Sequence, residues 1–187
     1  MNTAEFLTIA ASMVPDRVGI ICQGQEETFA QLQERTLRLA NALQALGVQK
    51  GEKVAVLSLN SIPYVETYYA CAKLGLTFVP LNYRAKREEL VYMLTNSQAS
   101  VLFVGERYLE LANSLRPEVP GLRHVICYDA RPEGIPYYED VLAQHQPEEV
   151  FVDVDDSEPA ILMYTSGTTA LPKGVVLTHL ALSVYVT

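Results

Sequence analysis

Tryptophan is absent from this 187-residue sequence, and cysteine and histidine occur only three times each. Cys22, Cys71 and Cys127 stand far apart, and no pair has the CxxC spacing of a zinc site or a redox-active dithiol. A disulfide framework is typical of small secreted domains that are dense in cysteine, and this sequence is not. Because each cysteine has apolar neighbours, we predict three buried, reduced thiols.

Positive charge is also scarce, since 14 lysines and arginines face 22 aspartates and glutamates and the net charge is −8. This balance argues against a nucleic-acid partner, because phosphate backbones favour basic surfaces. No apolar run approaches the roughly 20 residues that a transmembrane helix requires, and no basic residue precedes the apolar part of the N-terminus. We therefore expect a cytoplasmic protein. The first residues instead predict a short amphipathic helix with one apolar side formed by Phe6, Leu7, Ile9, Ala10 and Met13.

The sequence does contain a regular alternation of strand-like and helix-like segments. Two short strands are expected within residues 18–29, and Thr28 with Gln31 forms the capping box of a helix that ends at Gly47. Apolar runs predict strands at 54–59, 78–81, 101–104 and 124–127, and helices are expected at 61–75, 86–95, 106–115 and 137–143. This alternation implies an α/β fold with a mostly parallel sheet flanked by helices, and we assign residues 1–158 to it.

The remaining residues have a different character. Residues 147–159 are rich in acidic side chains and are expected to form a solvated connector. Apolar strands at 160–164 and 175–177 then enclose the segment YTSGTTALPKGV, which occupies residues 164–175. We assign residues 159–187 to a strand–loop–strand unit and the start of a further, incomplete subdomain.

The side chains of this segment suit a polyphosphate. Ser and Thr hydroxyls and backbone N–H groups donate to phosphate oxygens, glycine lets the backbone approach an anion, and Lys173 adds a mobile positive charge. The segment is not a Walker A loop, because in that motif a helix follows the lysine directly. Here Gly174, Val175 and Val176 follow and favour a strand. An ordinary hairpin, which is the structural alternative, rarely needs so many turn-forming residues followed by Pro-Lys-Gly.

The pattern IxxYTSGTTxxPKGVxLTH at residues 161–179 resembles the phosphate-binding signature of the adenylate-forming (AMP-binding) superfamily. That superfamily contains acyl-CoA synthetases, aryl-CoA ligases, luciferases and the adenylation domains of peptide synthetases. The resemblance covers the whole chain, because TFAQLQERTLRLANALQALGVQKGEKVAVLSLNS and YYACAKLGLTFVPLNYR are similar to the family's N-terminal region. The second of these segments looks closest to fatty-acyl-CoA synthetases.

The resemblance implies an AMP-forming acid–thiol ligase. Such an enzyme activates a carboxylic acid, here a fatty acid, with ATP and passes the acyl group of the acyl-adenylate to coenzyme A. Mg²⁺ is implied together with ATP. An aryl-CoA ligase and an amino-acid-adenylating domain remain alternatives. By the same resemblance, the ATP phosphates are held by Thr165, Ser166, Gly167, Thr168, Thr169 and Lys173.

Two positions depart from the family pattern. Ala170 stands where the family usually has glycine, so a left-handed backbone there would strain the loop, whereas an ordinary backbone would leave it unaffected. Members often carry His-x-Asn after Leu-Thr, and this chain keeps only His179. We expect His179 to be a packing or capping residue and not a catalyst.

Members of the family continue for several hundred residues past this loop. The resemblance therefore implies that the adenine pocket, the metal ligand, the acyl tunnel and the catalytic lysine lie outside this chain. We expect the N-terminal part of a synthetase, with no catalytic residue, no assigned metal ligand and no turnover by itself. A natural short paralogue that acts as a non-catalytic interaction module is the alternative. We also expect residues 184–186 to form a strand edge through which the chain self-associates.

Overall fold

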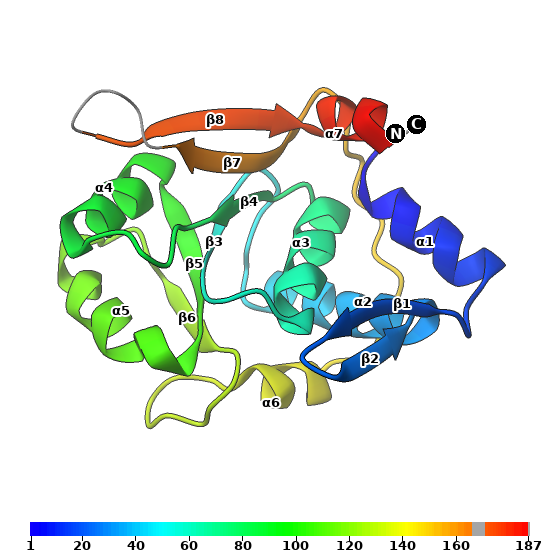
Figure 1. The fold of residues 1–187 in the computed structure, drawn as a ribbon, viewed down its shortest axis with the longest axis horizontal. Coiled ribbons are helices and arrows are strands. Elements are labelled where there is room, and N and C mark those ends of the chain that lie inside the picture. The colour runs from blue at the N-terminus through cyan, green and yellow to red at the C-terminus, as the bar shows by residue number, and fades with distance from the viewer. Residues whose placement is uncertain (166–170, 187) are drawn as a thin grey trace.

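The computed structural model describes residues 1–165 and 171–186, and its main body is a six-stranded sheet between two layers of helices (Figure 1). The order across the sheet is β6-β5-β3-β4-β7-β8. The paired parallel strands are β3 (Lys53–Leu57), β4 (Thr77–Pro80), β5 (Ala99–Val104), β6 (His124–Cys127) and β7 (Pro159–Thr165). The last strand, β8 (Lys173–Thr178), runs antiparallel to β7. The predicted α/β class with a mostly parallel sheet is confirmed.

The predicted helices are present with small shifts at their ends. They are α1 (Ala4–Met13), α2 (Phe29–Ala45), α3 (Ile62–Leu74), α4 (Arg87–Ser97), α5 (Leu109–Leu115) and α6 (Tyr138–Ala143). A further helix, α7 (His179–Val186), follows β8, and 3-10 turns at Glu106–Tyr108 and Arg116–Glu118 flank α5. The expected short strands are β1 (Val18–Cys22) and β2 (Gln25–Thr28), which form a separate two-stranded sheet beside α2.

Local signals explain where the helices begin and end. The Thr28 hydroxyl accepts the Gln31 N–H at 3.2 Å and the Gln31 side chain accepts the Thr28 N–H at 2.9 Å, which confirms the capping box of α2. The Ser61 hydroxyl accepts the Tyr64 N–H at 3.3 Å at the start of α3. Gly75 ends that helix with a φ of 63°, a left-handed conformation that glycine adopts without strain.

Each face of the sheet has its own core, because successive strand residues point to opposite faces. Val54 and Val56 of β3 pack on the side covered by α2 and α3, and Ala55 and Leu57 pack on the side covered by α4 and α5. Cover on both faces explains why β3 and β5 are buried along nearly their whole length and why their sequences are continuous apolar runs.

The strand edge expected at residues 184–186 is wrong, because these residues belong to helix α7. The Thr178 hydroxyl accepts the Ala181 N–H at 3.1 Å and so caps a helix immediately after β8. This cap outweighs the strand preference of the β-branched residues that follow. At this side of the sheet, the outermost strand is therefore β8.

The expectations about helix α1 and about the cysteines are wrong in part. Helix α1 is present, but it buries Ala4 and Leu7 and leaves Ile9 and Met13 exposed. Apolar residues occupy most positions of α1, so the pattern did not single out one side. Cys71 and Cys127 are free and buried as predicted, whereas Cys22 is only half-buried.

The acidic segment at residues 147–158 is attached to the fold more firmly than a solvated connector. Lys50 Nζ lies 2.8 Å from Glu158 Oε1, and Lys73 Nζ lies 3.2 Å from Glu149 Oε1. Val150 packs against the α2–α3 core between these two ion pairs.

The division of the chain at residue 158 stays a prediction. Within residues 1–165 and 171–186, no helix combines the length and the apolar character needed to cross a membrane.

Candidate functional site

The predicted phosphate-binding segment connects β7 and β8, which form a hairpin along the top of the sheet in Figure 1. The register pairs Thr165 with Lys173 and Tyr164 with Gly174. Since β7 is parallel to β4, the connection leaves the sheet at the edge where the parallel strands end, here called the carboxyl edge. Ligands of open α/β sheets bind outside this edge, so the hairpin places its loop where a ligand is expected.

Two of the predicted phosphate-binding residues, Thr165 and Lys173, lie in the described part of the chain, and both are exposed. Paired residues of neighbouring strands project to the same face, so the hydroxyl and the ammonium group lie on one side of the hairpin. Within residues 1–165 and 171–186, neither side chain has a hydrogen-bonding or ionic partner. Both groups are exposed at the carboxyl edge, where a phosphate can reach them. Ser166, Gly167, Thr168, Thr169 and the variant position Ala170 lie outside the described residues.

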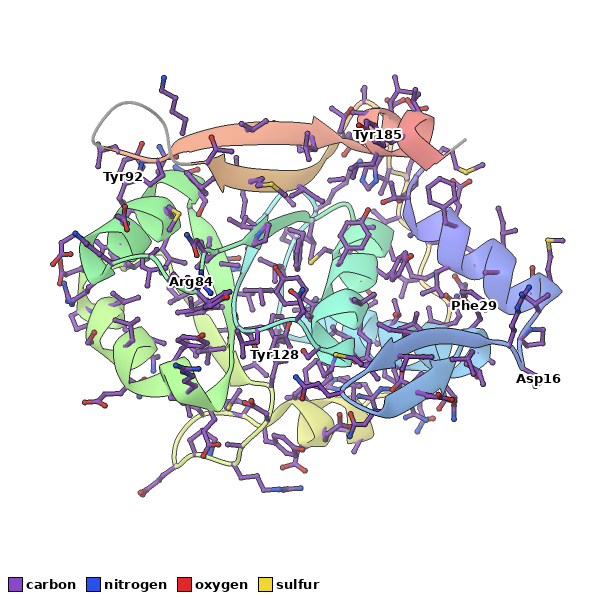
Figure 2. The ribbon with its side chains drawn as sticks, in the orientation of Figure 1. Asp16, Phe29, Arg84, Tyr92, Tyr128 and Tyr185 are labelled. Carbon is purple, nitrogen blue, oxygen red and sulfur yellow. The ribbon has the colours of Figure 1, made fainter. Side chains whose placement is uncertain are left out.

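The loop end of the hairpin is fixed to helix α4. The Tyr164 hydroxyl donates to Asn96 Oδ1 at 2.6 Å, and the Tyr164 ring packs with Leu162 against the α4–α5 core. Burial, followed by the nearby Tyr92, raises the pKa of Tyr164, so the phenol keeps its proton and remains a donor. Tyr92 is labelled on α4 beside this end of the hairpin in Figure 2. This hydrogen bond and this packing attach the end of β7 that leads into the loop to α4.

A second exposed cation at the carboxyl edge was not assigned a role from the sequence. Arg84 follows β4, the strand beside β7, and its guanidinium carbon lies 5.3 Å from the centroid of the Tyr83 ring (Figure 2). The Tyr83 ring in turn lies 6.4 Å from that of Tyr108, in the 3-10 turn that follows β5. The sequence signal that could have identified Tyr83 and Arg84 is their position shortly after the buried parallel strand β4.

His179 is buried at the start of α7 and ties the N-terminus to that helix. Its Nδ1 accepts the Thr3 backbone N–H at 3.2 Å, so in the neutral ring the proton is on Nε2. Nε2 is buried and has no hydrogen-bond partner in the part of the chain that the structure describes. Burial lowers the pKa of His179 and keeps the ring neutral. These contacts agree with the expected packing role.

A cavity at the other end of the sheet does not include the hairpin. It measures about 620 Å³ and lies beyond β6, where Arg116, Arg123 and Arg131 contribute to its walls. A smaller, almost wholly apolar hollow of about 300 Å³ lies between α3, β4 and β7, beside Met163. The described ranges contain no group of three His, Cys, Asp or Glu side chains placed to hold a metal ion. Thr165 and Lys173 do not line either of these two cavities, and they lie at the exposed carboxyl edge of the sheet.

Comparison with known proteins places this geometry in a family. Residues 7–187 match the family model described as AMP-binding enzyme, and the chain belongs to that family. It is 36% identical over 185 residues to a 3-oxocholest-4-en-26-oate–CoA ligase of Rhodococcus rhodochrous, covering 96% of this chain and 33% of that protein. It is 38% identical over 169 residues to a feruloyl-CoA synthase of an Amycolatopsis species, covering 90% and 32%.

The solved structure of an anthranilate CoA ligase in complex with anthranoyl-AMP has the same fold. Its TM-score is 0.92 at 29% identity, over 96% of this chain and 35% of that one. The predicted family is confirmed, and the chain spans about a third of the length of the curated relatives it matches. The names of these relatives have CoA ester formation in common and differ in the acid.

Proposed function

We propose that the whole protein is an ATP-dependent acyl-CoA synthetase. It joins a carboxylate to AMP with release of pyrophosphate, and then transfers the acyl group to the thiol of coenzyme A with release of AMP. The observation that carries this proposal is the β7–β8 hairpin, which holds the exposed side chains of Thr165 and Lys173 on one face at the carboxyl edge of an AMP-binding family sheet. We also propose a cytoplasmic location.

In this proposal the hairpin loop binds the β and γ phosphates of ATP. The carboxylate oxygen attacks the α phosphorus, the bond from that phosphorus to the bridging oxygen breaks, and negative charge develops on pyrophosphate. Donors that face this leaving group stabilise the charge as it forms. Mg²⁺ would share the same charge, and its ligands stay unassigned. The proposed phosphate-binding residues are Thr165, Ser166, Gly167, Thr168, Thr169 and Lys173.

For the acid, we propose a fatty acid. Residues 68–84 support this choice through their likeness to fatty-acyl-CoA synthetases. An aromatic acid is the second candidate, because a feruloyl-CoA synthase and an anthranilate CoA ligase match almost the whole chain.

The experiment is ATP–pyrophosphate exchange by the whole protein, started by a fatty acid, an aromatic acid or an amino acid. Lys173→Ala is expected to slow the exchange by about 10²–10³-fold while the protein stays folded, because a donor to developing charge acts mainly in the transition state. Exchange with the aromatic acid alone would favour the second candidate. The synthetase proposal would be overturned if only amino acids started the exchange, or if none of the three kinds of acid did.

The chain offers a matched control for this substitution. Lys53 opens strand β3 in the sequence Lys-Val-Ala-Val-Leu, and Lys173 opens β8 in Lys-Gly-Val-Val-Leu. Because β3 and β8 run in opposite directions, Lys53 lies at the edge of the sheet away from the loop. Lys53→Ala should leave the exchange rate close to that of the unchanged protein. Equal losses for both variants would contradict the assigned role of Lys173.

A further inference from the structure

Four elements meet around a single arginine on the side of the molecule away from the β7–β8 hairpin. Arg35 of α2 donates to both carboxylate oxygens of Glu139 on α6, at 2.6 and 3.0 Å. It also donates to both oxygens of Glu66 on α3, with its Nη2 3.3 Å from Oε2 and its Nε on Oε1. Glu27 of β2 completes the group, with Oε1 3.2 Å from Arg35 Nε. These four residues are called the Arg35 cluster below.

The charges of the Arg35 cluster do not balance if every group is ionised. One guanidinium then faces three carboxylates, of which Glu66 is completely buried and Glu27 is 16% exposed. Carboxylates brought together away from water repel one another, and the usual relief is that one of them takes up a proton. The geometry identifies which one does.

Glu66 and Glu139 have donors for both of their oxygens. Arg35 contacts all four of these atoms, and the Tyr138 hydroxyl donates to Glu66 Oε2 at 2.5 Å. Glu27 differs, because its Oε2 is buried and accepts no hydrogen bond from any residue in the described ranges. A buried carboxylate oxygen that accepts no hydrogen bond costs stability. If that oxygen carries the proton, it becomes a donor and needs a nearby acceptor. Glu27 Oε1 and Glu66 Oε1 both contact Arg35 Nε, so Glu66 is the neighbouring carboxylate that can accept this proton.

We propose that Glu27 carries a proton near neutral pH and donates it to Glu66, and that loss of this proton at alkaline pH weakens the attachment of the β1–β2 hairpin to α2, α3 and α6. The proposal is independent of the acyl-CoA synthetase activity. The hairpin has its own two-stranded sheet and does not pair with a strand of the central one. Apart from its direct continuation into α2 and the backbone hydrogen bonds that Phe29 and Ala30 donate to residues 17 and 15, its position depends on side-chain contacts such as these.

The electrostatics agree with this arrangement. Burial, followed by the charge of Glu66, raises the pKa of Glu27 from 4.5 to about 7. Burial alone would lower the pKa of Arg35, but its hydrogen bonds to Glu139 and Glu66 outweigh burial, and the pKa is raised. Burial also raises the pKa of Tyr138, which therefore stays a neutral donor. Glu26, Glu34 and Arg38 line the adjacent cavity of about 460 Å³ and are the other charged groups nearby.

The sign of the pH dependence follows from the raised pKa. The folded protein holds the proton of Glu27 more tightly than the unfolded chain, so this group stabilises the fold fully below pH 4.5. The stabilisation falls as the pH rises towards about 7 and is absent at higher pH.

The test compares Glu27→Gln with Glu26→Gln in urea unfolding of the protein between pH 5 and pH 9. The amide of Glu27→Gln keeps an N–H donor for Glu66 without a titrating proton. Glu26→Gln makes the same side-chain replacement at the neighbouring, exposed position of β2. Between pH 5 and pH 9, the ratio of the unfolding equilibrium constant of the unchanged protein to that of Glu27→Gln is expected to rise on the order of 100-fold. Glu26→Gln should behave like the unchanged protein, and an unaltered pH dependence in Glu27→Gln would overturn the proposal.

A spectroscopic measurement tests the proton directly and does not depend on unfolding. The infrared difference spectrum between the unchanged protein and Glu27→Gln at pH 6 should contain the carbonyl band of a protonated carboxylic acid. That band should disappear by pH 9 and should persist in Glu26→Gln at pH 6. A spectrum without it at pH 6 would show that Glu27 is ionised and would reject the proposal.

Discussion

Two segments of nearly the same sequence occupy opposite environments in this chain. Residues 53–57, Lys-Val-Ala-Val-Leu, form β3, and residues 173–177, Lys-Gly-Val-Val-Leu, form most of β8. In β3 the four residues after the lysine are all 0% exposed. In β8 the two central valines, Val175 and Val176, are 43% and 55% exposed. Both segments are strands, so their sequences determine the backbone but not the burial.

The difference comes from the neighbours of each strand. β3 pairs with β4 and β5, and helices cover both of its faces. β8 pairs with β7 alone in the described part of the chain, and it is the outermost strand of the sheet. The central strand therefore supports the fold, whereas the outer strand presents a loop. Self-association stays a prediction, and the strand edge available for it is that of β8.

The largest expected effect is the difference between the two matched valines. Val56→Ala should lower the free energy of unfolding by about 2 kcal/mol, because it deletes buried methyl groups and leaves a cavity. Val176→Ala at the corresponding position of β8 should change it by less than about 0.5 kcal/mol. Urea unfolding of the 187-residue chain measures both. Equal losses would show that Val176 is covered in solution and would break the comparison.

An intermediate effect is expected where the outer hairpin is attached to the buried layer. Tyr164→Phe removes the hydroxyl that donates to Asn96 Oδ1 and should lower the free energy of unfolding by about 1 kcal/mol. Asn96→Ala tests the same bond from α4, and the double variant should lose less than the sum of the two single losses. Strict additivity in this double-mutant cycle would mean that the hydrogen bond does not form in solution.

Much of the fold was accessible from the sequence because its signals are local. The buried parallel strands are continuous apolar runs, and the capping residues Thr28 and Ser61 and the terminal Gly75 mark the ends of helices within a few residues. The errors about burial arose where it depends on distant parts of the chain. Ile9 and Met13 have the same apolar character as Leu7, and only the position of α1 against α2 and α3 decides which of them is covered.

The candidate site was accessible from the sequence for a different reason. Its hydroxyl-rich segment and Lys173 are contiguous, so the chemistry could be read without knowing the fold. Arg84 is distant in sequence and reaches the carboxyl edge only through the pairing of β4 with β7. The Arg35 cluster is assembled from β2, α2, α3 and α6, and no local pattern brings Glu27 to Glu66.

The smallest expected effect concerns the position at which the two matched segments differ most, Val54 in β3 and Gly174 in β8. A Cβ added at Gly174 would lie 3.0 Å from Leu162 Cδ1 and 3.4 Å from Tyr164 Cε1. The closest of these atoms is the end of a flexible side chain that can move by a few tenths of an ångström. Alanine also reduces the freedom of the unfolded chain, which offsets the tighter contact by about 0.4–1 kcal/mol. Gly174→Ala should therefore change the free energy of unfolding by less than about 0.5 kcal/mol in either direction. A loss above about 1.5 kcal/mol would show that Leu162 and Tyr164 hold β8 as rigidly as the core holds β3, and that the contrast between the two strands is one of exposure alone.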